Sequence, residues 1–456
     1  MIPTVLFQIR KNKRRTGKYL FILLIPFIFI ISCEKLDLQK VEKFKVTTAA
    51  DANALLEDCF KLLKGTLEDK NDGKKKDFPV YLMIMSGLYS DNMDYSGSTN
   101  SWRDFDDHTL NSNNEILEEI WNQGFELIEL ANQLIISVPD ITDLETSQKD
   151  FILGQAYGLR GYAHYLLMSH FVFIPFYDQP RYYSENPTQP TFQELIYLIE
   201  EDLSRAIDLI PDETLQHYLN KNAAYAILAR LYLRNQDWSN AKTTAEVIIN
   251  SGNHSLSENY NQLISLTSNT EIIWELDYAT GENNKLDYYF NQNPSPLFVA
   301  SSDLISSFEA GDPRKTAWIN SETEDDIIIK YLTLDNNPDL ILIRYAEILL
   351  IAAECAVHLN DLTSATAYLN QIRTRAGFAN ILLSTLPYSD ALKEIMNERR
   401  KELAFEGLRW FDISRTESAV KIFGDLGENF DEHKTIWPIP QSALDQNPNL
   451  NQNPGY

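Results

Sequence analysis

An internal repeat of two helical hairpins restricts the fold more than any other feature of this chain. One copy, at 229–252, reads ARLYLRNQDWSNAKTTAEVIINSG, and the other, at 353–377, reads AECAVHLNDLTSATAYLNQIRTRAG. Asp237 aligns with Asp361, and both copies carry an alanine four positions later and an isoleucine eleven positions later. Each copy reads as a helix, a short polar turn and a second helix whose alanines allow close packing. This spacing is typical of tetratricopeptide-like units, in which each hairpin buries one face against the next.

Other segments extend this pattern into a mainly α-helical scaffold. Their apolar residues recur at helical spacing, and Pro211 would end one of the helices. We predict two further helical pairs, 116–138 with 155–171 and 192–210 with 223–234, and additional helices at 340–359, 362–375 and 390–405. The helical repeats would therefore occupy about 115–252 and 340–405. An ordinary helical bundle is the alternative architecture.

Two regions, 78–110 and 252–337, interrupt the helical pattern. Both are rich in Ser, Asn, Asp and aromatic residues, and the second contains two strand-like stretches, 271–278 and 326–334. Loops of this length in a compact protein are usually functional or disordered, but disordered segments are poor in aromatic residues. We therefore predict that both regions are loop-rich insertions, the second partly β, that form a binding surface on the helical scaffold.

The amino terminus has the pattern of an export signal. Six basic residues between Arg10 and Lys18 precede an apolar run, 19–31, which is followed by Ser32 and Cys33. A membrane span needs about 20 apolar residues, whereas this shorter run fits the apolar part of a signal peptide. We predict a signal peptide at 1–32, lipidation of Cys33, a tether at 33–50 and a single body at 51–456. A simple membrane anchor, or an apolar stretch without function, is the alternative.

Charge and cysteine content restrict the partners and the covalent cross-links. Removal of 1–32 takes away six basic and no acidic residues, so the net charge changes from −25 to −31. A chain this acidic is a poor ligand for nucleic acids or anionic membrane surfaces. The remaining cysteines, Cys59 and Cys355, are too few to define a disulfide framework. Cys355 lies in an apolar helical segment and reads as a small buried hydrophobe.

No catalytic or metal-binding motif stands out. The chain lacks G-x-S-x-G, H-E-x-x-H and a phosphate-binding glycine loop. His164 and His170 lie six residues apart, on different faces of one predicted helix, and read as packing residues. The run at 92–97 resembles the start of a calcium loop, but Arg103 occupies the position of the bidentate glutamate. We assign no catalytic residue, cofactor or metal ligand; an incidental calcium ion would have no assignable site.

Two carboxy-terminal segments are the most distinctive. Asn397–Arg415 reads NERRKELAFEGLRWFDISR, an amphipathic helix with one buried and one solvated stripe that runs into a reversal at Gly407. Trp437–Tyr456 reads WPIPQSALDQNPNLNQNPGY, and its four prolines predict an extended tail at 436–456 instead of a helix. Both segments resemble the carboxy-terminal region of the SusD/RagB family, outer-membrane nutrient-binding lipoproteins of Bacteroidetes-type bacteria.

This resemblance implies a fold, a location and partners. Family members place a loop-rich ligand site on helical repeats, sit lipid-anchored on the outer membrane and act with a SusC-like TonB-dependent β-barrel transporter. The resemblance therefore implies a non-enzymatic surface protein that captures an oligo- or polysaccharide and delivers it to that transporter. Three alternatives remain: a receptor for peptides or other non-glycan nutrients, a tetratricopeptide scaffold that binds proteins only, and a hydrolase.

A glycan site needs exposed flat aromatic rings for the sugar faces and polar side chains for the hydroxyl groups. Both loop-rich regions offer this mixture, and Trp102 is the first candidate and Tyr289 the second. The alternative is that these rings pack beneath their own loops. Three other tryptophans, Trp274, Trp410 and Trp437, read as structural. The candidate ligand-binding residues are Tyr95, Asn100, Trp102, Arg103, Tyr288, Tyr289 and Asn291.

Overall fold

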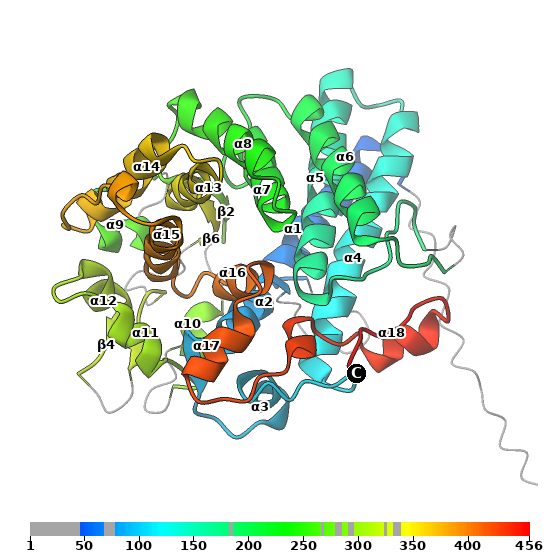
Figure 1. Cartoon of the computed structure of the whole chain (residues 1–456). Helices are drawn as coiled ribbons and strands as arrows, with labels where there is room; N and C mark the ends of the chain where they lie inside the picture. Colours follow the sequence, from blue (N-terminus) through cyan, green and yellow to red (C-terminus); the bar gives the residue numbers. More distant parts are fainter. Residues whose placement is uncertain are drawn as a thin grey trace, which may run out of the picture. The chain divides into compact units, whose positions relative to one another are not determined.

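The computed structural model describes 46–67, 78–181, 186–265, 269–278, 285–290, 296–322, 326–331 and 339–456. The predicted signal peptide, Cys33 and most of the predicted tether lie outside these residues. The segment Lys45–Tyr456 forms one compact, mainly helical unit (Figure 1). Among the described residues, no helix is both long and apolar enough to cross a bilayer.

The first layer of helices is held together by close backbone approach. In α5, Gly158 and Gly161 face α6: a Cβ at Gly158 would lie 3.3 Å from the Ala206 Cβ, and one at Gly161 would lie 3.2 Å from Leu203. The longest helix, α5, is buried between α4 and α6, which lie beside it in Figure 1. These elements confirm the predicted helices at 116–138, 155–171 and 192–210: α1 (Ala49–Leu63), α4 (Glu115–Ser137), η1 (Val138–Asp140), α5 (Thr146–Phe171) and α6 (Phe192–Leu209).

The predicted repeat is confirmed, down to its turns. The hairpins are α7 (Lys221–Arg234) with α8 (Trp238–Ser251) and α13 (Tyr345–His358) with α14 (Leu362–Arg375). Asp237 caps α8 by accepting from the Asn240 amide at 3.1 Å, and Asp361 caps α14 by accepting from the Ser364 amide at 3.2 Å. The residue before each aspartate has a left-handed backbone conformation, with φ of 56° at Gln236 and 59° at Asn360. The two hairpins pack through α8 and α13.

A sharp reversal follows α15 (Tyr388–Glu402), the helix predicted at 390–405. Phe405 and Gly407 have φ of 68° and 75°. A Cβ on Gly407 would lie 2.8 Å from the Met83 Cα, so only glycine fits this crossing of two backbones. The chain then continues through α16 (Arg409–Arg415), α17 (Ala419–Asp425) and η3 (Glu432–Thr435).

The β structure joins segments that are distant in sequence. One sheet has the order β1-β3-β5-β4, with antiparallel pairs throughout. In the other, β2 pairs with β6, and β2 confirms the strand predicted at 271–278. The strands are β1 (Met93–Tyr95), β2 (Ile272–Leu276), β3 (Phe298–Ala300), β4 (Ile319–Asn320), β5 (Ile327–Ile328) and β6 (Leu340–Arg344). The remaining helices are α9 (Tyr260–Ser265), α10 (Leu286–Phe290), α11 (Ser302–Ser307), α12 (Pro313–Trp318) and η2 (Leu383–Thr385).

Three local predictions are wrong. The segment 78–110, expected to be irregular, contains α2 (Phe78–Leu88) and α3 (Asn100–Asp106); α2 is apolar on almost all sides and therefore shows no helical period. The helix predicted from Leu340 starts only at Tyr345, because strand β6 precedes it. The predicted extended tail contains the short helix α18 (Gln441–Gln446), which follows Pro440. Of the strand predicted at 326–334, β5 is present and 332–334 lie outside the described residues.

The interior confirms several predictions about single residues. Trp274, Trp410 and Trp437 are fully buried. Cys355 is buried, as predicted; Cys59, for which no burial was predicted, is also buried, and both are free cysteines. His164 and His170 are buried packing residues: the Nδ1 atom of each lies 3.0 and 2.8 Å, respectively, from the carbonyl oxygen four residues earlier.

Candidate functional site

Strands β1 and β3 bring the two loop-rich regions together. Tyr95 pairs with Phe298, and Met93 pairs with Ala300. This pairing assembles a group of aromatic side chains, here named the ring cluster, which consists of Tyr81, Tyr95, Trp102, Tyr288, Tyr289 and Phe298. The rings come from α2, β1, α3, α10 and β3.

Trp102 lies at the centre of the ring cluster. Its ring centroid is 4.8 Å from that of Phe298, 5.3 Å from that of Tyr289 and 6.2 Å from that of Tyr81. Trp102 is partly buried, and the side chain of Tyr288 next to Tyr289 is 58% exposed. Within the cluster, Tyr288 is exposed, Trp102 and Tyr81 are partly exposed, and the remaining rings are buried.

Polar groups lie beside these rings. The Arg103 guanidinium is 5.1 Å from the Tyr95 ring centroid and donates to the Gly97 carbonyl at 2.6 Å. Asp106 accepts a hydrogen bond from the Tyr95 amide at 3.3 Å. Burial, together with the neighbouring Asp94 and Asp107 carboxylates, raises the pKa of Asp106 to about 7, while the Tyr95 amide and Arg103 act in the opposite direction. The site thus combines guanidinium and carboxyl groups at the edge of an aromatic surface.

The candidate residues are placed as follows. Tyr95, Trp102, Arg103, Tyr288 and Tyr289 meet in and beside the ring cluster, and Asn100 is exposed at the start of α3. Asn291 lies outside the described residues. The side chains of Tyr95 and Tyr289 are only 5% and 8% exposed, so they support Trp102 and offer little surface themselves.

Sequence reasoning missed Tyr81 and Phe298. Tyr81 lies on α2, whose continuous apolar run conceals its helical period. Phe298 lies on β3, where the buried–intermediate–buried alternation covers only three residues. A strand this short gives too weak a pattern for recognition.

The distinctive stretch 397–415 anchors the ring cluster to the helical scaffold. Arg409 donates two hydrogen bonds of 2.6 Å to the two carboxylate oxygens of Asp91, two residues before β1. Arg400 donates to the Asp91 carbonyl at 2.6 Å and to Asp303, just after β3, at 2.7 Å. Burial alone would raise the pKa of Asp91, but the Arg409 and Arg400 guanidinium groups lower it below its ordinary value. Both halves of the site are therefore fixed by paired charges.

The expectation that the charged stripe of this stretch faces solvent is wrong. Glu398, Arg399, Lys401 and Glu402 are all buried, on a helix that also buries Ile395. Glu402 pairs with the guanidinium groups of three arginines, and Arg415 forms two hydrogen bonds, of 2.6 and 2.7 Å, with Glu354. The three partners of Glu402 are Arg314, Arg344 and Arg375. Buried carboxylates neutralised in this way form a structural network.

The described residues contain no group of three or more His, Cys, Asp or Glu side chains arranged to hold a metal ion.

The fold defines the chain as a tetratricopeptide-like helical-repeat protein, and comparisons with known proteins refine this. Residues 330–456 match the family model of the SusD family, and residues 36–233 match the model described as starch-binding associating with outer membrane. The chain belongs to the SusD/RagB family. The SusD-like protein P2 of Formosa agariphila is 25% identical to this chain over an alignment of 520 positions. The alignment covers 96% of this chain and 100% of that protein.

A further relative in sequence and one solved structure are similar to this chain. The SusD-like protein P38 of the same organism is 26% identical over 415 residues, which cover 76% of this chain and 81% of that protein. The solved structure of a laminarin binding SusD-like protein superposes with a TM-score of 0.76 at 21% identity, covering 90% of this chain and 100% of that one. The predicted fold class, a mainly helical protein with tetratricopeptide-like repeats, is confirmed.

Proposed function

We propose that this protein captures an oligo- or polysaccharide at the cell surface, with the ring cluster as its binding site. The observation that carries the proposal is the ring cluster, in which the partly exposed Trp102 and the exposed Tyr288 lie on a base anchored by Arg400 and Arg409. Two descriptions of related proteins support it: one matching family model is described as starch-binding, and one relative of known structure is described as laminarin binding.

Binding would rest on complementary surfaces, without bond cleavage. The apolar C–H face of a sugar ring stacks on Trp102 or Tyr288, because exposed aromatic faces lose unfavourable contact with water when they are covered. Arg103 and Asn100 stand at the edge, where they can donate hydrogen bonds to ring hydroxyl groups. A labelled glycan recovered intact after incubation with the pure protein supports this mechanism, and its cleavage would support the hydrolase alternative.

The same proposal includes delivery. The protein would be held on the outer membrane by acyl chains on Cys33 and would pass its ligand to a SusC-like TonB-dependent β-barrel transporter. Family membership and the description of one matching model, which associates it with the outer membrane, support this. Stable anchoring needs more than one acyl chain. Protease treatment of intact cells tests the location, and copurification with the transporter tests the partnership.

The deciding experiment is calorimetry of the full chain in detergent against starch, laminarin and a panel of host, plant and microbial glycans. Trp102→Ala is expected to weaken binding about tenfold or more, because a central stacking ring contributes roughly 1–2 kcal/mol. Trp238→Ala is the matched control, since Trp238 is partly buried on α8, outside the ring cluster, and stacks on His358 at 3.7 Å. If no glycan of the panel binds, or if the Trp102→Ala and Trp238→Ala variants bind a glycan with equal affinity, the proposal is contradicted and a peptide or protein ligand is favoured.

A further inference from the structure

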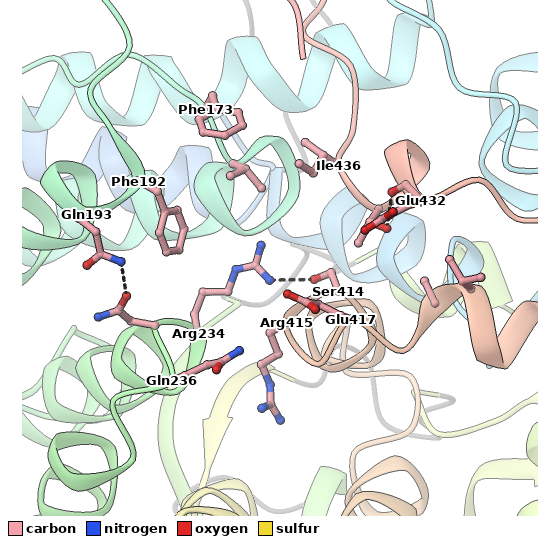
Figure 2. Close-up of a pocket in the computed structure, with 15 residues that line it drawn as sticks. Phe173, Phe192, Gln193, Arg234, Gln236, Ser414, Arg415, Glu417, Glu432 and Ile436 are labelled. Carbon is pink, nitrogen blue, oxygen red and sulfur yellow. Dashed lines mark hydrogen bonds between the residues drawn. The ribbon is translucent and has the colours of Figure 1, made fainter. Parts of the chain in front are cut away.

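A pocket lies away from the ring cluster, between the helical repeats and the carboxy-terminal helices. It encloses about 570 Å³, within the range of small-molecule sites, roughly 300–1,000 Å³. Figure 2 shows Arg234, the last residue of α7, with its guanidinium directed across the pocket toward Ser414. The wall also contains the rings of Phe173 and Phe192 and the amide side chains of Gln193 and Gln236.

Arg234 is partly buried, with its Nε atom shielded from water, and it differs from the buried arginines of the described residues, because each of those pairs with a carboxylate. The paired arginines are Arg160, Arg230, Arg314, Arg344, Arg373, Arg399 and Arg415. Arg234 instead donates to a neutral hydroxyl, Ser414 Oγ, at 3.2 Å, and its buried Nε has no acceptor. It forms no ion pair with a described carboxylate. Burial lowers the pKa of Arg234 to about 10, and Arg415 adds to this, but the side chain remains cationic at neutral pH.

The other charged groups of the pocket leave this cation uncompensated. Arg415 points away from the pocket in Figure 2, and its guanidinium is bound by Glu354 and Asp412. Glu417 and Glu432 lie at the rim and are exposed to solvent, where water and salt weaken their influence. A partly buried cation without a charged partner, and with a shielded Nε that has no acceptor, is costly, and an anion bound beside it would reduce that cost.

Backbone strain occurs on the same wall. Val172 has φ of 60° and ψ of −64°, and the Phe173 amide donates to the Phe171 carbonyl at 2.7 Å. This is a γ-turn of the rare, strained kind, and a β-branched residue at positive φ is a conformational outlier. Such strain persists where the surrounding structure maintains it, and it often accompanies ligand sites. Here it sets Val172 and Phe173 into the pocket wall beside Arg234.

We propose that this pocket binds a small sugar acid, with its carboxylate on the Arg234 guanidinium and the Ser414 hydroxyl. A single guanidinium matches one carboxylate in charge and in hydrogen-bond geometry. One guanidinium carries a single positive charge, which a monoanion neutralises and a doubly charged phosphate would exceed. The partly buried ring of Phe192 offers an apolar face, and the amides of Gln193 and Gln236 suit hydroxyl groups. This site is separate from the ring cluster and does not depend on its function.

The proposal is tested by measuring the binding of glucuronate to the full chain in detergent. Glucose is the matched neutral sugar, and acetate is the carboxylate without a sugar ring. Calorimetry is expected to show saturable binding of glucuronate, no binding of glucose and at least tenfold weaker binding of acetate. Arg234→Gln is expected to weaken glucuronate binding at least tenfold. Arg205→Gln is the control, because Arg205 is exposed on α6, outside the pocket. Acetate binding as tight as that of glucuronate would overturn the sugar-acid assignment.

The stability of the variant adds a second measurement. Without ligand, Arg234→Gln is expected to unfold at the same temperature as the native chain or higher, because an unpaired cation has been removed. If Arg234→Gln does not fold, Ser414→Ala and Gln236→Ala replace it, each with an expected several-fold loss of glucuronate affinity. The proposal is overturned if the native chain does not bind glucuronate, or if the pocket variants bind it unchanged. Neutral glycan binding at the ring cluster is measured separately, so either proposal can fail alone.

Discussion

At the scale of single residues, Asp106, which accepts a hydrogen bond from the Tyr95 amide, makes the stability of the fold depend on pH. Its pKa is about 7 in the folded protein and 3.8 in the ordinary, unfolded environment. Between these values the folded state binds more protons than the unfolded state, so the free energy of unfolding falls as the pH rises from about 4 to about 7. Asp106→Asn is expected to flatten this dependence. Urea denaturation across that pH range measures it.

Asp140→Asn is the matched control for that measurement, because Asp140 is exposed after α4. It is expected to leave the pH dependence of unfolding as it is in the native chain. An Asp106→Asn variant with the native slope would show that Asp106 is not the responsible group.

The ring cluster also shows how far single residues can be interpreted from sequence. Flat rings among polar residues identified Trp102 and Tyr288 as candidates, and both face solvent to some extent. Tyr95 and Tyr289 lie in equally polar stretches, yet they are buried. The difference arises from the pairing of β1 with β3, which joins residues about 200 positions apart. Local composition contains no information about a contact of that separation.

At the scale of elements, the repeated aspartate caps allow a quantitative test. Asp361→Ala is expected to lower the free energy of unfolding by about 1 kcal/mol, since it removes the acceptor for the Ser364 amide at the start of α14. Asp237→Ala is expected to have a similar effect at the start of α8. Asp361→Asn keeps a side-chain acceptor and should recover most of the loss. Equal destabilisation by Asn and Ala at position 361 would show that the negative charge, and not the cap, stabilises this turn.

Helices whose apolar residues recur with a clear helical period could be predicted from the sequence, whereas elements without such a period could not. Helices α4, α6 and α15 have one apolar face, and their positions were predicted to within a few residues. Helix α2 lacks a polar face because it is enclosed by the rest of the fold, and β6 is a strand because it pairs with β2, more than 60 residues earlier. Both depend on tertiary contacts, which override local propensity.

At the scale of the whole molecule, buried charges connect the repeats to the ring cluster. Helix α15 contributes buried acids and bases that pair with β6, α12, α13 and α14. Arg400 and Arg409 extend the network to α11 and to Asp91, just before β1. The helical period of the sequence alone predicts that these charged side chains lie on the solvent-exposed face of the helix. Their burial explains why the stretch 397–415 is so distinctive, since each charge requires its partner in the fold.

Arg409 tests whether this network holds the site in place. Arg409→Met is expected to lower the free energy of unfolding by about 3 kcal/mol, because it leaves the buried Asp91 carboxylate with weaker compensation. Hydrogen exchange should quicken at β1, α3 and β3, while α7 and α8 keep their native protection. The double variant Asp91→Leu, Arg409→Met removes both charges and should recover part of the stability, as a double-mutant cycle would show. Uniform loss of protection throughout the chain would mean that Arg409 stabilises the fold globally and does not anchor the ring cluster in particular.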